Sequence, residues 1–364
     1  MMSEFQIQLV TRDEQVLQFN CLAGEDIVSA AERAELYLIS QCRSGSCGAC
    51  IGTATRGQYV QDIDPDIANS IAHTEQVLLC RTYPRSDLQV VLPYDANQVR
   101  KQPLPMRQAT LLEKNYLTPD TLQLKLQLIE DEDGNLSLAF EPGQYIEIWI
   151  PQTEIKRAYS IANAPNWDGV LELLIKLRSH GQFAQYITEQ AQVGDVLTLQ
   201  GASGNFTLQD RGLRPRYFIA GGCGLASVMA MVRQMAELQE PHEVQLLFGV
   251  WREEEVFYQS ELAELAADYP NLHYQICVQD ATPTWQGFHG SVADAFKALM
   301  QNTPTTPDIY ICGSNGLIER VAEVAATFNI SKDQLIHEHY GAQATNTSHF
   351  CQEDSCSMPY AVAS

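Results

Sequence analysis

Four cysteines constrain this chain more than any other feature of its sequence. Cys42, Cys47 and Cys50 are separated by four and then by two residues, and Cys80 lies further along. This is the spacing of a plant-type 2Fe-2S cluster. The small residues between these cysteines let the backbone curl and turn N–H donors toward negatively charged sulfurs. Structural zinc sites usually pair cysteines as two C-x2-C knuckles, and only one such pair is present, so we predict a 2Fe-2S cluster on these four thiols.

The chain is long enough for two or three domains, because it has 364 residues with 45% hydrophobic content. Its start, "MMSEFQIQLV", lacks the basic residues and apolar core of a secretory signal, and the least polar stretch, "YFIAGGCGLASVMAMV", is short and interrupted by glycines. We therefore expect a soluble, cytoplasmic protein. In that compartment closely spaced cysteines bind metal or take part in redox chemistry more often than they form disulfides.

The charge of the chain bears on its partners. With 45 acidic and 23 basic residues, the formal net charge is -22. Nucleic acids and anionic membrane surfaces bind basic surfaces, so we expect neither as a partner. The acidic surface fits docking onto a basic protein, and it equally fits a coat of charge that keeps the chain in solution.

The first domain is expected over residues 1–98. The segments "EFQIQLV" and "QVLQFNC" alternate as two strands do, and "DIVSAAERAELYL" has the period of a helix. Two strands, a helix and a cysteine loop resemble the α+β beta-grasp fold of ferredoxins. The proline-bearing stretch "VLPYDANQVRKQPLPMRQ" then loses the regular pattern and marks the boundary.

The second domain, expected over residues 99–211, consists of short alternating segments without helices between them, which indicates a small antiparallel β-barrel. One of its strands carries Arg157, Ala158, Tyr159 and Ser160, and alternation places the arginine and the tyrosine on one face. By itself this motif also fits an ordinary strand with a packed tyrosine.

The order of three motifs, "EPGQYIEI", "RAYS" and "GQFAQYI", resembles the flavin domain of the ferredoxin reductase superfamily. The resemblance implies that Arg157 pairs with the FAD pyrophosphate, that Tyr159 packs on the isoalloxazine, and that Ser160 reaches its redox-active nitrogen. Ala184 stands where that family has a small hydroxyl residue, and Ala202 where it has proline. Backbone N–H groups of a helix beginning near Gly181, Gln182 and Ala184 would then bind the pyrophosphate.

The third domain is expected over residues 212–340, where strand and helix segments alternate as in a doubly wound α/β fold with a parallel sheet. Its first strand ends in the glycine turn Gly221, Gly222, Cys223 and Gly224, a place where a nucleotide pyrophosphate can approach the backbone. The turn lacks the third glycine of the Rossmann fingerprint. It resembles the glycine-rich turn of ferredoxin reductases, with Cys223 in place of threonine.

Two more segments match that family. In "YICGSNG", the resemblance places Cys312 and Gly313 beside the nicotinamide, although the prolines that follow in the family are absent. A small buried hydrophobic residue is the alternative role of Cys312. In "IHEHY", Glu338 and Tyr340 match an acidic-then-aromatic ending near the flavin, and an exposed terminal glutamate is the alternative. Ser160, Cys312 and Glu338 are thus the predicted catalytic residues.

The tail, residues 341–364, is expected to be disordered, because its small and polar residues cannot bury a core. His349, Cys351 and Cys356 have spacings that would also permit metal binding or a disulfide. Three ligands fall short of a closed structural metal site. Cys21 and Cys277 lie in strand-like segments and are expected to be packing residues.

Taken in order, the ferredoxin, flavin and nicotinamide domains resemble the reductase components of bacterial multicomponent di-iron monooxygenases, such as the soluble methane monooxygenase reductase. The resemblance implies transfer of electrons from NADH through FAD and the 2Fe-2S cluster to an oxygenase hydroxylase component. A reductase for a Rieske ring-hydroxylating dioxygenase and a non-enzymatic electron carrier or redox sensor are the alternatives. Glu253, Glu254 and Glu255 favour NADH over NADPH by repelling a 2'-phosphate, whereas Arg252 is able to pair with one.

Overall fold

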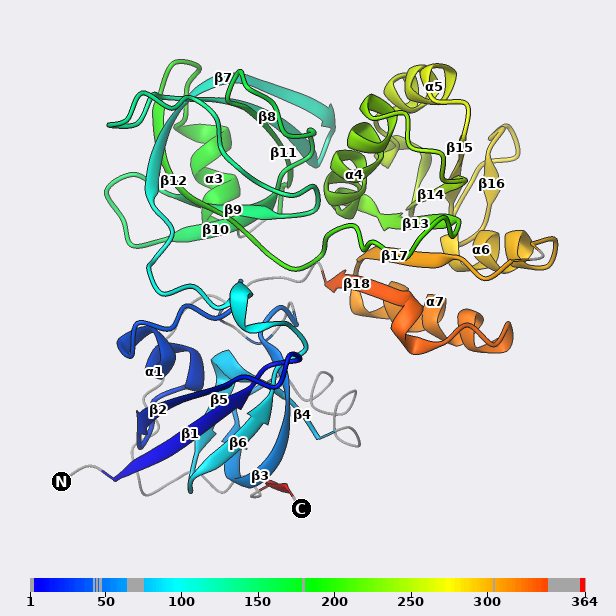
Figure 1. Ribbon diagram of the computed structural model, residues 1–364. Coiled ribbons are helices and arrows are strands. Elements are labelled where there is room, and N and C mark those ends of the chain that lie inside the picture. The colour runs from blue at the N-terminus through cyan, green and yellow to red at the C-terminus, as the bar shows by residue number, and fades with distance from the viewer. Residues whose placement is uncertain are drawn as a thin grey trace. The chain divides into compact units, whose positions relative to one another are not determined.

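The computed structural model describes residues 3–41, 43, 45, 48–63, 75–178, 181–303, 305–339 and 361–363 (Figure 1). The chain divides into two compact units, one of Met1–Pro103 with Gly341–Ser364 and one of Leu104–Tyr340. The predicted site residues Cys42, Cys47 and Tyr340 lie outside the described residues. So does the predicted disorder of the tail, of which only Ala361–Ala363 is described.

In the residues that the structure describes, the first unit is a mixed sheet covered by helix α1 (Ile27–Arg33), as the beta-grasp prediction requires. Helix α1 begins at Asp26, whose carboxylate accepts a hydrogen bond from the Ser29 N–H at 3.0 Å. Its buried face joins the core of the unit, in which Cys21 is also buried. The strands are β1 (Glu4–Val10), β2 (Val16–Leu22), β3 (Ile51–Gln61), β4 (Gln76–Leu78), β5 (Thr82–Pro84), β6 (Leu88–Val91) and β19 (Ala361–Ala363), with order β19-β3-β6-β1-β2, and β4 and β5 also pair with β3.

The second unit begins with a six-stranded antiparallel sheet, in order β10-β9-β12-β7-β8-β11. An antiparallel bridge between Ile161 and Leu173 joins its two ends, so the sheet closes into the predicted barrel. Helix α3 (Gln182–Glu189) packs Phe183 and Ile187 into the barrel core. The strands are β7 (Met106–Thr118), β8 (Thr121–Leu128), β9 (Tyr145–Trp149), β10 (Lys156–Ser160), β11 (Val170–Lys176) and β12 (Val196–Ser203).

The same unit continues into a parallel sheet with order β16-β15-β14-β13-β17-β18, flanked by helices, which confirms the α/β prediction. The strands are β13 (Arg216–Gly221), β14 (Val244–Val250), β15 (Leu272–Val278), β16 (Phe288–His289), β17 (Asp308–Gly313) and β18 (Leu335–His339). The helices are α4 (Leu225–Glu237), α5 (Gln259–Asp268), α6 (Val292–Met300) and α7 (Asn315–Thr327), with short 3-10 turns η3 (Gly222–Gly224) and η4 (Glu253–Glu255). Cys277 is buried in β15, as expected of a packing residue.

The barrel and the parallel sheet share one apolar core. Leu174 of β11 and Phe206, which follows β12, belong to the same cluster as Phe218 of β13 and Met231 of α4. Burial of apolar surface contributes about 25 cal/mol per Å², so this shared core holds the two domains of the second unit together.

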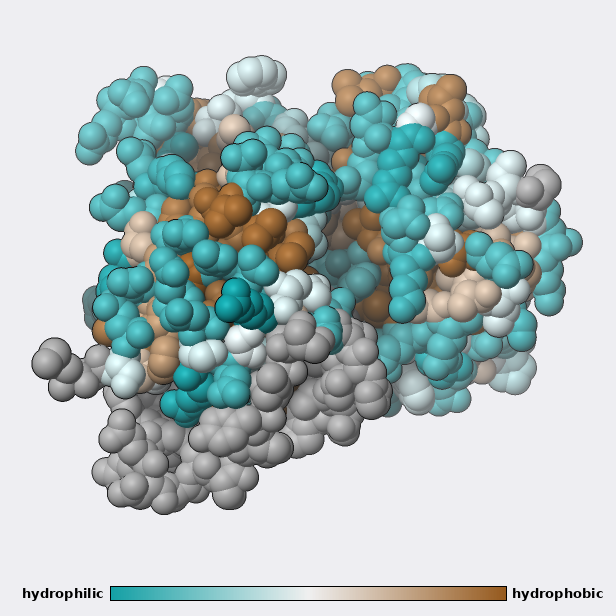
Figure 2. All heavy atoms as spheres, turned by 60° about the horizontal axis from the view of Figure 1, so that its bottom comes forward, coloured by the Kyte–Doolittle hydropathy of each residue, from teal (hydrophilic) through white to brown (hydrophobic). Residues whose placement is uncertain are grey.

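The visible surface is largely polar. On the face that Figure 2 shows, hydrophilic residues cover most of the coloured surface. Among the helices of the described residues, we find none with both the length and the apolar character that a membrane crossing requires.

Candidate functional site

The carboxyl ends of two neighbouring strands bring the predicted nicotinamide residues together. β13 and β17 are parallel partners with Ala220 opposite Cys312, so the glycine turn after β13 lies beside the end of β17. At Gly224 a Cβ atom would stand only 2.3 Å from the carbonyl oxygen of Cys312, so no larger residue fits without a shift of the backbone. The sequence requirement for glycine here follows from close packing of η3 on β17.

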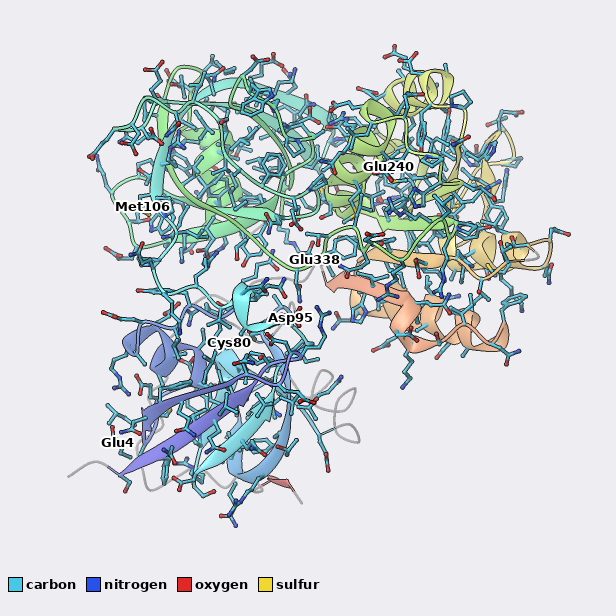
Figure 3. All side chains as sticks on the ribbon, viewed as in Figure 1. Glu4, Cys80, Asp95, Met106, Glu240 and Glu338 are labelled. Atoms are coloured by element: carbon cyan, nitrogen blue, oxygen red, sulfur yellow. The ribbon has the colours of Figure 1, made fainter. Side chains whose placement is uncertain are left out.

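Glu338, which Figure 3 labels, is buried and contacts three polar side chains. β18 pairs with β17 in a register that places Glu338 opposite Cys312. Its Oε2 atom lies 3.2 Å from Ser227 Oγ of α4, 3.5 Å from Ser160 Oγ of β10 and 3.8 Å from Cys312 Sγ. Two of the predicted catalytic residues, Ser160 and Cys312, therefore both contact the carboxylate of the third, Glu338.

The environment of this carboxylate favours its protonated form. Burial raises the pKa of Glu338 to about 7, although the hydroxyls of Ser227 and Ser160 act in the opposite direction by donating to the charged form. Burial also raises the pKa of the Cys312 thiol well above its ordinary value. Glu338 is only 7% exposed, so the structure does not match the alternative of an exposed terminal glutamate.

The barrel motif faces helix α3. The guanidinium of Arg157 donates to the carbonyl of Lys156 at 2.7 Å and lies 3.4 Å from the side-chain oxygen of Gln182. The half-buried ring of Tyr159 lies 5.0 Å from the ring of Phe183, centroid to centroid. Arg157 and Tyr159 therefore contact successive residues of one helix, which agrees with the predicted common face; Ala158 stands between them.

The start of α3 suits an anion. Gly181 is its N-cap residue and offers no side-chain cap, so the first N–H groups of the helix point toward the space before it. Ala184 is buried in the first turn. The cation of Arg157 beside this helix start is the donor set that a pyrophosphate requires, so the residues present fit the flavin nucleotide. The glycine turn after β13 is also open to a nucleotide. Gly222 in this turn has a φ of +53°, and apart from its chain neighbours no atom lies within 4 Å of the position that its Cβ would take.

In the first unit, two predicted cluster ligands are described and lie together. Cys50 and Cys80 are 2% and 4% exposed, and their sulfur atoms are 3.3 Å apart without a disulfide between them. Two thiolates on one tetrahedral metal ion, with metal–sulfur bonds of about 2.3 Å, would stand about 3.8 Å apart. At 3.3 Å the two sulfur atoms are about 0.5 Å closer than that, near enough for both thiols to serve as ligands of one cluster.

Ser227 is the member of the Glu338 cluster that sequence reasoning did not identify. It closes the motif "GGCGLAS", in which the glycines drew attention because of the pyrophosphate. A signal was available, since a serine in the first turn of the helix after β13 lies near the end of every strand adjacent to β13. The identity of its partner depends on the pairing of β17 with β18, which the sequence does not specify.

Three family models match the chain in the order of its domains: a 2Fe-2S iron-sulfur cluster binding domain over residues 10–85, an oxidoreductase FAD-binding domain over 108–208 and an oxidoreductase NAD-binding domain over 218–323. Methane monooxygenase component C of Methylosinus trichosporium is 36% identical over 304 residues, which cover 82% of this chain and 87% of that protein. The toluate 1,2-dioxygenase electron transfer component of Pseudomonas putida is 30% identical over 325 residues, 88% of this chain and 94% of that protein.

Among solved structures, a cytochrome P450 reductase of Amycolatopsis superposes with a TM-score of 0.70, at 24% identity, over 93% of this chain and 100% of that one. At that identity the similarity concerns the fold alone. The superposition extends over all three domains of this chain.

Proposed function

This chain belongs to the flavin and 2Fe-2S reductases that supply electrons to multicomponent oxygenases, and from that premise we propose that it oxidises NADH and serves the hydroxylase component of a di-iron monooxygenase. The observation that supports the monooxygenase is the higher identity to the methane monooxygenase component, 36%, than to the toluate dioxygenase component, 30%. The reductase of a Rieske dioxygenase remains the second candidate because the latter similarity spans 88% of the chain.

The proposed roles follow the site. NADH gives up a hydride, whereas the hydroxylase takes electrons singly, and bound FAD supplies the conversion because it accepts two electrons and releases them one at a time. Cys42, Cys47, Cys50 and Cys80 hold the cluster. FAD is held by Arg157, Ala158, Tyr159, Ser160, Gly181, Gln182, Ala184 and Tyr340, and the nicotinamide nucleotide by Gly221, Gly222, Cys223, Gly224, Cys312 and Gly313.

We propose that Glu338, which the sequence resemblance placed near the flavin, acts as an acid–base group in this scheme. Its carboxylate contacts a barrel hydroxyl, Ser160, and a thiol of the sheet, Cys312. A carboxyl with a pKa of about 7 holds or releases a proton with equal ease at neutral pH.

The preference for NADH is supported by the surroundings of Arg252. Its Nε atom lies 3.4 Å from a carboxylate oxygen of Glu254 and 3.6 Å from one of Glu255, so these carboxylates offset part of its charge. The carboxylate of Glu253 accepts the N–H of Thr282 at 2.7 Å. A 2'-phosphate would meet three carboxylates at this turn. Changing Glu254 and Glu255 to glutamine should release Arg252 and shift the ratio of kcat/KM for NADPH over NADH about tenfold upward, the effect of about 1.4 kcal/mol.

The experiment that tests the function is an anaerobic titration of the purified protein with NADH, followed by absorbance and electron paramagnetic resonance. One FAD and one 2Fe-2S cluster per chain should become reduced. Zinc in place of iron, or protein without flavin, would contradict the assignment. Full-length Cys80→Ser should still reduce ferricyanide with NADH but should fail to support the hydroxylase. Undiminished delivery of electrons to the hydroxylase by this variant would show that flavin, and not the cluster, is the exit.

The partner class is tested by reconstitution. The reductase should support turnover by a di-iron hydroxylase at lower concentration than by a Rieske oxygenase. The reverse order would favour the dioxygenase assignment. A protein that exchanges electrons with its cluster but never oxidises a nicotinamide nucleotide would be an electron carrier or a sensor.

A further inference from the structure

Ser227 has a polar environment that its own helix does not explain. It lies in the first turn of α4 and is fully buried, at 0% exposure. The N-cap residue of α4 is Gly224, which has no side chain, so Ser227 is not the cap of its helix. A buried hydroxyl without a hydrogen bond is costly, and alanine would serve equally well if the position only needed to be filled.

The partners of Ser227 lie on other elements. Its Oγ atom is 3.2 Å from Glu338 Oε2 of β18 and 3.9 Å from Cys312 Sγ of β17. The contact with Glu338 is shorter than that made by Ser160, at 3.5 Å. Among the described residues, Ser227 is thus the closest hydroxyl donor to the carboxylate, and it approaches from helix α4, which packs on β13 and β17.

From this geometry we propose that Ser227 is a positioning residue, which holds the carboxyl group of Glu338 in contact with both Ser160 and Cys312 and favours its ionised form. A hydrogen bond donated to a carboxylate stabilises the charged state, and in a buried site it also fixes the rotamer of the side chain. The inference rests on the proposed function and deepens it, because it names the residue that controls the proposed acid–base group.

The other groups near Glu338 do not provide this control. The titratable group that faces it from β17 is Cys312, and Cys223 of η3 adds to the raised pKa of that thiol. Burial raises the pKa of both thiols, that of Cys223 to about 11, so both are neutral at neutral pH. Within the part of the chain that the structure describes, no cation pairs with Glu338, and the ionised carboxylate depends on hydroxyl and thiol donors alone.

The test is an infrared titration of the full-length FAD-containing protein without NADH. The carbonyl band of the protonated Glu338 carboxyl is assigned by its loss in Glu338→Gln. We expect a midpoint near pH 7 in the natural sequence. In Ser227→Ala the midpoint should move upward by about one pH unit, because one hydrogen bond to a charged group is lost. Ser227→Thr keeps the hydroxyl and should restore the original midpoint.

A second readout is the pH profile of flavin reduction by NADH, which should move upward with the infrared midpoint in Ser227→Ala. Tyr217→Phe is the matched control, since it removes a buried hydroxyl from the opposite end of β13, 3.1 Å from Thr303 Oγ. It should leave both titrations unchanged. If Ser227→Ala does not fold, Ser227→Cys is measured instead, because a weak thiol donor should shift the midpoint in the same direction.

Identical midpoints in the natural protein and in Ser227→Ala would overturn the inference. A downward shift would overturn it as well. Failure of the proposed function has a different signature. The infrared midpoint would still shift in Ser227→Ala, but NADH would not reduce the flavin of the natural protein. The two ideas are therefore separated by one set of samples.

Discussion

Two glutamates are buried in the second unit, and their surroundings are opposite. Glu172 of β11 accepts hydrogen bonds from Tyr258 and from Arg233, the latter at 3.0 Å, and Gln123 lies 3.2 Å from the same tyrosine hydroxyl. Among the described side chains, those that hydrogen-bond to Glu338 are hydroxyls and a thiol. Burial by itself raises the pKa of either carboxyl, but the cation of Arg233 and the hydrogen bonds bring the pKa of Glu172 below its ordinary value.

This difference separates a structural carboxylate from a reactive one. Arg233 reaches from α4 across to the barrel, where it also donates to the carbonyl of Ala162 at 2.9 Å, and its guanidinium lies 5.5 Å from the centre of the Tyr258 ring. The Glu172 cluster therefore joins the flavin and nicotinamide domains through a fixed charge. The Glu338 cluster spans the same two domains but leaves its carboxyl free to change its protonation state. A partner cation is what distinguishes the two.

The largest expected effect comes from removing that cation. Arg233→Met leaves Glu172 buried without its positive partner, and loss of one member of a buried pair costs about 4 kcal/mol. The release of FAD on heating, followed by flavin fluorescence, should occur roughly 8 to 16 °C lower than in the natural protein.

The control is Arg233→Met combined with Glu172→Leu, which removes both charges and should recover a large part of the loss. A single variant that melts at the natural temperature would mean that the ion pair does not contribute to the junction of the two domains.

Sequence reasoning identified the two clusters to different extents, and the reason is physical. Most elements of both clusters were predictable, since short strands were expected in the barrel and alternating strands and helices after it, and β10, β11, α4 and β17 match that expectation. β18, which carries Glu338, was not predicted as a strand. Ser160, Cys312 and Glu338 were found because each belongs to a short motif of a known family. Glu172 and Arg233 stand 61 residues apart and belong to no motif, so only the packing of α4 on the barrel brings them together.

Tyr258 illustrates the same limit. Its φ of +57° places a bulky side chain in the left-handed region that favours glycine, which local propensity disfavours. The tertiary contacts of its hydroxyl and ring compensate for this, and no local pattern reports them. The four cysteines predicted to bind the 2Fe-2S cluster are different, because a local sequence pattern, their spacing, was enough to predict the cofactor. Two of these four, Cys50 and Cys80, are among the described residues.

The second effect is the pH dependence of stability, which should have opposite signs for Glu338 and Glu172. Glu338 has a folded pKa of about 7, above its ordinary 4.5, so its contribution to stability is present at low pH and is lost as the pH rises toward 7. Between about pH 5.5 and 8.5 the loss is about 2 kcal/mol, or roughly 4 to 8 °C in the temperature of FAD release. Glu338→Gln should abolish this loss, since glutamine does not titrate.

Glu172 should show the opposite sign. Its folded pKa is lowered, so its contribution is present above the ordinary value and is lost only as the pH falls through the lowered one. Glu172→Gln should therefore lower the temperature of FAD release throughout the neutral range without changing its pH slope. A steeper slope in Glu172→Gln than in Glu338→Gln would reverse the assignment of the structural and the reactive carboxyl.

The smallest effect distinguishes the role of a hydroxyl in each cluster. Tyr258→Phe removes one donor from Glu172 but leaves Arg233, so the carboxylate stays ionised and the cost is about 1.5 kcal/mol, or roughly 3 to 6 °C in FAD release. The pH profile of flavin reduction should not move, because the cation still fixes the charge. Ser227→Ala removes a hydroxyl of the same kind from a carboxyl that has no cation, so there the pH profile should move while the melting temperature at low pH does not. Tyr258→Phe should be measured beside Ser227→Ala under the same conditions. A shift of the pH profile in Tyr258→Phe would mean that the Glu172 cluster also takes part in proton exchange. A buried cation beside a carboxylate would then not be enough to identify that carboxylate as structural.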